Sequence, residues 1–192
     1  MNPTRDFFDR HSCGWDAREN PAFAAVIERI LDRFAPGPVD RFLDVACGTG
    51  VLVPYLERRA VSDYTALDFS EGMARCFSEK YPGKKILVAD FQTPGLFVPA
   101  SFSKIMIYNA FPHFSEPGAV FANAYELLKS GGELCIAHSM NRQRLNRHHE
   151  RSGVSGHRLV SDAEIRGFYE GAGFVQVLAE NADYFYSRGV KP

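Results

Sequence analysis

Residues 42–50 have the sequence "FLDVACGTG", in which a short apolar run leads into a glycine-containing turn. The apolar part, within residues 40–46, predicts a buried β-strand. Gly48 and Gly50 then open a helical stretch that extends to about residue 59. Glycines at such a turn let the backbone approach a ligand, and the helix N-terminus offers free N–H groups. The segment therefore predicts an α/β domain that binds a ligand at its first loop.

Strand-like and helix-like segments alternate on the carboxyl side of this loop as far as residue 180. Further strands are predicted at 63–69, 84–90, 101–110, 133–139, 174–180 and 182–188. This alternation favours a parallel sheet with helices on both faces. The last two strands are separated by a very short turn, which makes the final strand antiparallel. We expect one doubly wound α/β domain over residues 1–192, with a mainly parallel seven-stranded sheet.

Several helix ends carry local signals. A helix is predicted after Asn20, which is its expected N-cap, and its apolar residues recur every three or four positions to residue 34. Ser161 and Glu164 have the spacing of a capping box at the start of a later helix. The helix after the fourth strand is expected to end at Gly131 and Gly132.

Composition limits the function classes. The 192 residues are 45% hydrophobic and 23% charged, with a net charge of −1, which is ordinary for a single globular domain and argues against a nucleic-acid or membrane-surface field. No apolar run approaches the roughly 20 residues of a membrane span, and the N-terminus lacks the apolar core of a secretory signal. The four cysteines are widely spaced, without a CxxC pair. We expect a cytoplasmic protein with reduced thiols.

Two common phosphate-binding loops do not fit the glycine turn. A dinucleotide fingerprint needs a third glycine where this chain has Val53, and no Gly-Lys-Ser/Thr sequence of a P-loop follows. Instead, "LDVACGTG" resembles motif I of the class I S-adenosylmethionine-dependent methyltransferases, an acidic residue followed by G-x-G-x-G. Ala46 replaces the first glycine, so we expect its φ angle to stay negative. The resemblance extends through the element order of residues 40–180.

This resemblance implies a Rossmann-like methyltransferase of small-molecule type that uses S-adenosyl-L-methionine and releases S-adenosyl-L-homocysteine. It places Asp44 near the amino group of the cofactor, Asp68 on the ribose hydroxyls and Asp90 on the adenine amine. Each aspartate alone is more often a turn residue, but three at successive strand ends beside a glycine turn favour a site. The predicted cofactor-binding residues are Asp44, Ala46, Gly48, Gly50, Asp68, Phe69, Asp90, Phe91 and Asn109.

Residues for the methyl acceptor are predicted from the ends of the fourth and fifth strands. The sequence "NAFPHF" from Asn109 lacks the [DN]-P-P-[YFW] signature of adenine and glutamine amino methyltransferases. His138 is the first candidate for the base and His113 the second, because histidine has a pKa near neutrality and strand ends are rigid. The residues expected to contact the acceptor are Phe111, Arg142, His148 and His149.

Residues 138–158 contain four of the six histidines and several arginines. A solvated helix face, a pocket for an anionic acceptor, a metal site and a nucleic-acid surface all remain open here. Adjacent His148 and His149 point about 100° apart on a helix, so no metal site is predicted from their spacing. The alternatives for the whole chain are a non-catalytic adenosyl-ligand or metal-binding protein, and an RNA methyltransferase, which the net charge disfavours.

The N-terminal residues 1–19 precede the predicted core. Phe7, His11 and Trp15 recur every four positions and would form one aromatic helix face. We expect this segment to be either a lid over the cofactor or a hydrophobic anchor. No large insertion separates the strands, which favours a small acceptor. The sequence does not predict the oligomeric state.

Overall fold

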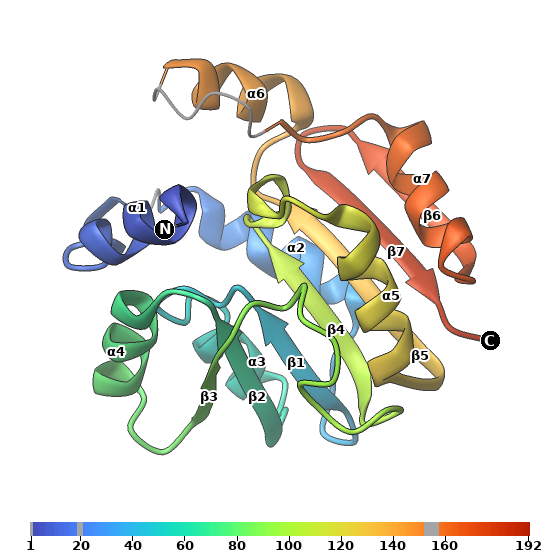
Figure 1. The fold of residues 1–192 in the computed structure, drawn as a ribbon, viewed down its shortest axis with the longest axis horizontal. Coiled ribbons are helices and arrows are strands. Elements are labelled where there is room, and N and C mark those ends of the chain that lie inside the picture. Colours follow the sequence, from blue (N-terminus) through green and yellow to red (C-terminus); the bar gives the residue numbers. More distant parts are fainter. Residues whose placement is uncertain (1, 19–20, 152–157) are drawn as a thin grey trace.

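A computed structural model describes residues 2–18, 21–151 and 158–192, which form a seven-stranded sheet flanked by helices (Figure 1). The strand order is β3-β2-β1-β4-β5-β7-β6. The strands are β1 Arg41–Val45, β2 Asp63–Asp68, β3 Lys85–Val88, β4 Phe102–Tyr108, β5 Leu128–His138, β6 Val175–Asn181 and β7 Phe185–Val190. The pairs among β1 to β5 are parallel, while β7 is antiparallel to both β5 and β6. This confirms the predicted fold class, including the antiparallel last strand.

Helices cover both faces of the sheet. They are α1 Pro3–His11, α2 Phe23–Phe34, α3 Val53–Arg58, α4 Glu71–Lys80, α5 Pro117–Leu127, α6 Arg142–Arg151 and α7 Asp162–Gly171, with 3₁₀ turns η1 Asp16–Arg18 and η2 Phe111–His113. One apolar core contains Ile30 of α2, Leu56 of α3 and Phe77 of α4, and the opposite core contains Phe121 of α5 and Tyr169 of α7. Burial on both faces explains why the central strands are almost continuously apolar.

The end of α5 differs from the sequence prediction. The helix ends at Leu127, and residues 128–132, which include the two glycines expected to end it, already belong to β5. Lys191 Nζ donates to the carbonyls of Tyr125 and Leu128, at 2.8 and 2.7 Å. It therefore satisfies carbonyl groups that have no partner within the helix at the C-terminal end of α5. Because Lys191 is more than sixty residues away in the sequence, the local sequence around α5 did not predict this contact.

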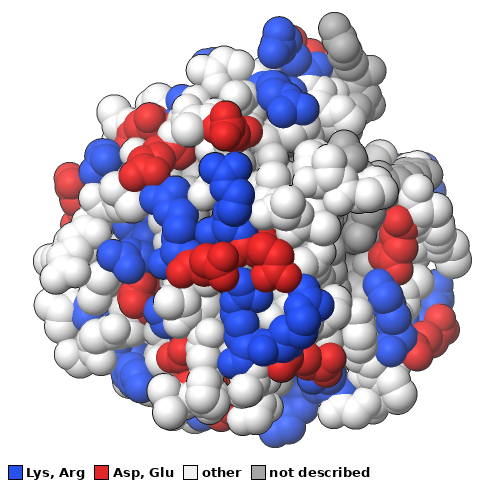
Figure 2. All heavy atoms as spheres, turned by 180° about the vertical axis from the view of Figure 1, so that it is seen from behind, with Lys and Arg blue, Asp and Glu red and all other residues white. Residues whose placement is uncertain are grey.

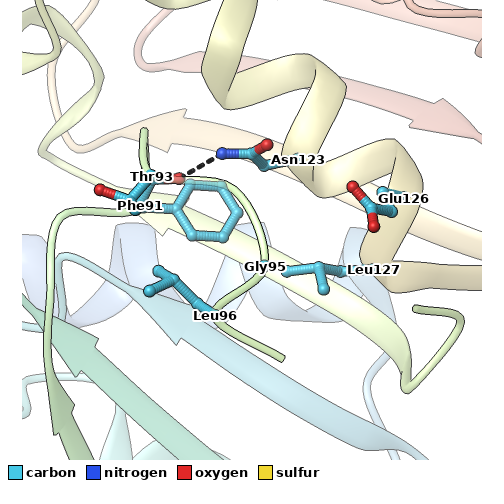
Figure 3. Close-up of a pocket in the computed structure, with 7 residues that line it drawn as sticks. All are labelled: Phe91, Thr93, Gly95, Leu96, Asn123, Glu126 and Leu127. Atoms are coloured by element: carbon cyan, nitrogen blue, oxygen red, sulfur yellow. Dashed lines mark hydrogen bonds between the residues drawn. The ribbon is translucent and has the colours of Figure 1, made fainter. Parts of the chain in front are cut away.

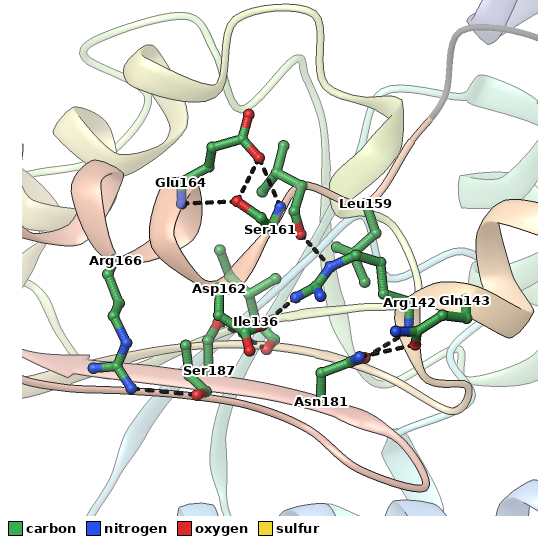
Figure 4. A network of polar contacts seen from close by, with 12 residues as sticks. Ile136, Arg142, Gln143, Leu159, Ser161, Asp162, Glu164, Arg166, Asn181 and Ser187 are labelled. Atoms are coloured by element: carbon green, nitrogen blue, oxygen red, sulfur yellow. Dashed lines mark hydrogen bonds and ion pairs between the residues drawn. The ribbon is translucent and has the colours of Figure 1, made fainter.

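Capping residues were predicted for the N-termini of α7 and α2. The box at α7 is confirmed: Ser161 Oγ accepts from Glu164 N at 3.2 Å, and Glu164 Oε2 accepts from Ser161 N at 2.8 Å (Figure 4). Helix α2 begins at Phe23 after Ala22, which makes no side-chain cap. Asn20, the expected cap, lies outside the described residues.

The surface behind the sheet carries charges of both signs in alternation (Figure 2). Ion pairs made by α2 and α3 include Arg58–Glu28 at 2.5 Å and Arg33–Glu180 at 2.8 Å. Since opposite charges alternate, this face has no single-sign field of the kind that attracts nucleic acid. Within the described part of the chain, the helices are too short or too polar to cross a membrane.

Candidate active site

A cavity of about 1000 Å³ lies at the carboxyl ends of the parallel strands. Its walls come from the loops after β1, β2, β3 and β4, from α1 and η1, from the start of α2 and from α6. Helices α1 and α6 lie beyond these strand ends in Figure 1. In open α/β sheets, ligands bind in this position because the loops that follow the strands meet there.

The glycine loop after β1 forms one wall. Gly48 has a φ of +56°, and a Cβ built on it would meet no atom within 4 Å, so this glycine borders open space beside the cavity. Gly50 has a φ of +90° and a different role, since a Cβ there would lie 2.7 Å from the Tyr81 ring and 2.8 Å from Phe77. Gly48 thus leaves room for a ligand, whereas Gly50 lets the loop pack against α4.

The backbone conformation of Ala46, which lines the cavity, differs from the one expected from the sequence. Its φ is +55°, in the left-handed region, instead of the expected negative value. A left-handed conformation costs a residue with a Cβ about 1–2 kcal/mol. The surrounding fold therefore imposes on alanine the backbone shape that the family pattern gives to glycine.

Asp68, at the end of β2, lines the cavity and is 5% exposed. Its Oδ2 accepts from Gly48 N at 2.8 Å, and its Oδ1 accepts from Ser70 N at 2.9 Å. Burial raises the pKa of this carboxyl to about 6, although the two backbone hydrogen bonds favour the charged form. The carboxylate thus connects the glycine loop to the N-terminus of α4.

Asp44 lies beneath the glycine loop and does not line the cavity. It is 2% exposed, and its Oδ2 accepts from the Tyr64 hydroxyl at 2.8 Å. Burial raises its pKa to about 7, and the nearby charge of Asp68 adds to this, while the Tyr64 hydrogen bond acts in the opposite direction. The structure gives this aspartate a place below the site, where contact with a ligand would be indirect.

The remaining predicted cofactor residues line the cavity from three loops: Phe69 after β2, Asp90 and Phe91 after β3, and Asn109 after β4. Asp90 Oδ1 accepts from Gln92 N at 3.0 Å. Asn109 Oδ1 accepts from Ser139 N at 2.8 Å, which joins the ends of β4 and β5.

Phe91 has a buried ring that packs into the α5 side of the fold. Its carbonyl accepts from Asn123 of α5 at 2.8 Å, and its ring lies near Leu96 and Leu127 in a separate small pocket (Figure 3). The residue therefore anchors the loop after β3 as well as bordering the cavity.

The two predicted base candidates lie in different environments. His113 lines the cavity, and its ring centroid is 5.1 Å from that of Phe8 on α1. His138 is 1% exposed, does not line the cavity, and faces Phe185 with ring centroids 6.3 Å apart. Alternate residues of a strand share a face, so the His138 side chain points to the same face as Leu134 and Ile136, toward the core beneath α5 and α7.

The structure separates the predicted acceptor-binding residues. His148 lines the cavity, whereas the side chain of His149 lies outside the described part of the chain. Phe111 is buried against Phe121 at 5.9 Å between ring centroids. Arg142 is ion-paired with Asp162, as Figure 4 shows.

Arg142 also bonds to backbone. Its Nε donates to the Val160 carbonyl at 2.6 Å, and its own N–H donates to Asn181 at 2.6 Å. Neither Arg142 nor Phe111 lines the cavity. Both side chains hold the fold together around the site.

The N-terminal segment, residues 2–18, contributes an aromatic wall made of Phe7, Phe8, His11 and Trp15. Two carboxylates attach the segment to the core. Asp9 Oδ1 accepts from Ser70 Oγ at 2.6 Å and from Gly72 N at 2.9 Å. Asp16 accepts from the Thr49 hydroxyl at 2.5 Å and pairs with Lys80 at 2.7 Å. Neither aspartate was predicted from the sequence, because nothing in a charged N-terminus distinguishes an attachment point from a solvated residue.

Several apolar residues of the cavity were not among the predicted site residues: Tyr108, Phe114, Met140 and Leu145. Met73, for which contact with the adenosine and core packing were equally favoured by the sequence, also lines the cavity. Apolar residues near strand ends have the same pattern as core residues, so only the folded arrangement distinguishes the two. Among the described residues, no group of three or more His, Cys, Asp or Glu side chains is arranged to hold a metal ion.

Comparison with known proteins agrees with this architecture. A family model described as "Methyltransferase domain" matches residues 43–136. A Haloferax volcanii putative methyltransferase, solved in complex with the Trm112 methyltransferase activator, is similar with a TM-score of 0.81 and 19% identity, covering 100% of this chain and 97% of that one. A Thermotoga maritima methyltransferase described as a possible histamine N-methyltransferase is similar with a TM-score of 0.73 and 18% identity, covering 98% of this chain and 100% of that one. A search of curated proteins found no match.

The strand order, the glycine loop and the carboxylates at successive strand ends define a Rossmann-like methyltransferase. The cavity fits an adenosyl cofactor, since Gly48 leaves open space beside it, Asp68 ends β2 and Asp90 follows β3. The matched domain and the shared fold identify the chain as an S-adenosylmethionine-dependent methyltransferase, and S-adenosylmethionine is its cofactor.

Proposed function

We propose that the protein transfers the methyl group of S-adenosylmethionine to a small-molecule acceptor by in-line displacement. The observation that carries the proposal is the continuous cavity of about 1000 Å³, which joins the glycine loop to the aromatic wall of the N-terminal segment. Small-molecule pockets span roughly 300–1000 Å³. A cavity at the upper end of this range has room for a cofactor together with a compact acceptor.

The strand-end loops would hold the cofactor. Asp68 and Asp90 would accept from ribose hydroxyls and from the adenine amine, respectively. Each oxygen of Asp68 already accepts one backbone N–H, but a carboxylate has about four acceptor positions, so capacity remains for hydroxyls. When bound, the cofactor supplies a methyl group on a sulfonium, so that an acceptor lone pair forms the new bond to carbon while the carbon–sulfur bond breaks and sulfur leaves as a neutral thioether.

His113 takes the role of proton acceptor in this proposal, in place of His138. It lines the cavity directly after β4, close to Asn109, whereas His138 faces the core. A neutral imidazole accepts a proton near neutral pH, as an amine or hydroxyl acceptor requires. His148 would contact the acceptor from α6. The N-terminal segment would exclude water, which strengthens the electrostatic interactions in the cavity.

A macromolecular acceptor is the alternative, and one comparison favours it. The Haloferax volcanii structure that matches this chain over its full length contains a Trm112 activator. An RNA acceptor predicts RNA binding that weakens steeply with salt. The mixed charges behind the sheet do not support it, and α1 and α6 cover the strand ends through which a large acceptor would enter. A non-catalytic metal-binding role finds no support in the described residues.

Calorimetry with S-adenosylhomocysteine tests the cofactor site. We expect about one equivalent to bind with micromolar affinity or better. Asp68→Ala should weaken binding by roughly 1.5–3 kcal/mol, the range for a hydrogen bond to a charged group. Asp63→Ala is the matched control, because Asp63 lies at the opposite end of β2. Absence of binding by the unaltered protein would refute the proposal.

A further inference from the structure

Among the described residues that line the cavity, the aspartates are the charged side chains. Within the described lining they are Asp16, Asp68 and Asp90, and none of these lining residues is lysine or arginine. Asp16 is paired with Lys80, whereas Asp68 and Asp90 accept hydrogen bonds from neutral groups. The cavity thus has a negative balance of charge.

Three arginines of α6 whose side chains the structure describes, Arg142, Arg144 and Arg147, do not line the cavity. Leu145 and His148, three residues apart on one helix face, line it. Arg144 and Arg147 precede each of them by one position and are exposed, and Arg147 Nε donates to a carbonyl of its own helix at 3.2 Å. Arg142 is taken up by its ion pair with Asp162. Among the described residues, the basic segment 138–158 therefore places no arginine in the cavity where it could contact the acceptor.

This charge distribution discriminates between acceptors. A carboxylate or phosphate buried here would lose hydration without a counter-charge among the described lining residues. Asp68 and Asp90 keep their negative charge when they accept hydrogen bonds from the cofactor, so they would still repel such an anion. A cation would be attracted by the same carboxylates and by aromatic ring faces. Phe8, whose ring contacts His113, and Phe114 supply aromatic rings in the lining. A third histidine, His11, donates from Nδ1 to the Phe7 carbonyl at 2.7 Å, which makes Nε2 the lone-pair nitrogen of its neutral ring.

On the basis of the proposed function, we infer that the methyl acceptor is an amine with an apolar body and without a carboxylate or phosphate group. Its ammonium form is attracted by the acidic, aromatic cavity, and its proton passes to His113 to free the nitrogen lone pair. The apolar body contacts Phe114, Met140 and Leu145. This replaces the anionic acceptor considered from the sequence, because the arginines that suggested it do not line the cavity.

The test compares three probes of similar size on protein saturated with S-adenosylhomocysteine: 2-phenylethylamine, 2-phenylethanol and 3-phenylpropionate. Calorimetry should show the amine binding at least about tenfold more tightly than the carboxylate, with the alcohol in between. A carboxylate that binds as tightly as the amine overturns the inference, and so does a failure of all three probes. Failure of S-adenosylhomocysteine itself to bind would instead overturn the proposed function, so the two failures are distinguishable.

A variant tests the aromatic contribution. Phe114→Leu keeps an apolar side chain but removes the ring face, so amine binding should weaken about three- to tenfold while alcohol binding changes less. Phe97→Leu is the matched control, because Phe97 packs against Phe102 at 5.2 Å between ring centroids and does not line the cavity. Equal losses for the amine and the alcohol in Phe114→Leu would contradict attraction of a cation by the ring.

Discussion

Asp9 of α1 accepts a 2.6 Å hydrogen bond from the hydroxyl of Ser70, the N-cap residue of α4. The backbone N–H of Ser70 in turn donates to Asp68 at 2.9 Å. One residue therefore connects the N-terminal helix to the carboxylate expected to hold the ribose. Closure of the N-terminal segment and order at the cofactor site should consequently be coupled.

Gly72→Ala tests this coupling. A Cβ at Gly72 would lie 2.7 Å from Ser12 Oγ and 3.0 Å from the Asp9 carbonyl, so the substitution should displace α1 from α4. We expect weaker S-adenosylhomocysteine binding, by about fivefold or more, and faster hydrogen exchange in residues 3–11. Gly118→Ala is the control, since Gly118 also lies in the first turn of a helix but a Cβ there would meet no atom within 4 Å. The control should gain up to about 1 kcal/mol of stability from helix propensity. Similar behaviour of the two variants would argue against close packing of α1.

Ala46→Gly tests the cost of the left-handed alanine in the glycine loop. Glycine should relieve about 1–2 kcal/mol of backbone strain and lose about 0.5–1 kcal/mol to chain entropy, for a net gain of roughly 0.5 kcal/mol in the free energy of unfolding. Ala60→Gly is the control, because Ala60 has a similar φ of +57° and does not line the cavity. Both variants should be slightly more stable in thermal melts, but only Ala46→Gly should bind S-adenosylhomocysteine more tightly. Weaker binding by Ala46→Gly would show that the methyl group of Ala46 contributes a favourable contact.

The two buried carboxyls make the stability of the free protein depend on pH. Burial raises the pKa of Asp44 to about 7 and that of Asp68 to about 6, above their usual value of 3.8. The folded protein therefore binds more protons than the unfolded chain between about pH 4 and 7, and these groups make stability fall as the pH rises through that range. Asp44→Asn should raise the melting temperature at pH 7 and reduce its decline between pH 5 and 7. Asp63→Asn, an exposed change, should leave the profile as it is. An unchanged profile in Asp44→Asn would contradict the burial effect.

His113→Ala and His138→Ala separate the two histidines predicted as the base. With 2-phenylethylamine as acceptor, His113→Ala should slow methyl transfer by roughly 10²–10⁴-fold while S-adenosylhomocysteine affinity stays the same. His138→Ala should instead lower the melting temperature, because the side chain is buried against Phe185, and leave the rate of the folded enzyme within a few-fold of normal. The reverse pattern would return the role of the base to His138.

Much of the fold followed from local patterns in the sequence. Alternating strand and helix signals predicted the sheet, the short turn before the last strand predicted its direction, and Ser161 with Glu164 predicted the start of α7. These features depend on residues close together in the chain, so a single sequence is enough to define them. The glycine loop and the aspartates at the ends of β2 and β3 were predicted in the same way, because each one marks the end of a strand.

Tertiary structure alone decided which side chains line the cavity. A strand end places His138 at the correct edge of the sheet, but the packing of α5 and α7 decides that its ring faces the core. Arg142 has a charge that suits an anionic ligand, yet Asp162, twenty residues further on, pairs with it. Lys191, more than sixty residues further on, donates to two carbonyls at the end of α5. The sequence by itself determined the order of the elements and the position of the site, because these follow from short-range periodicity and turn chemistry. The contents of the site depend on contacts between distant segments, whose geometry only the folded chain defines.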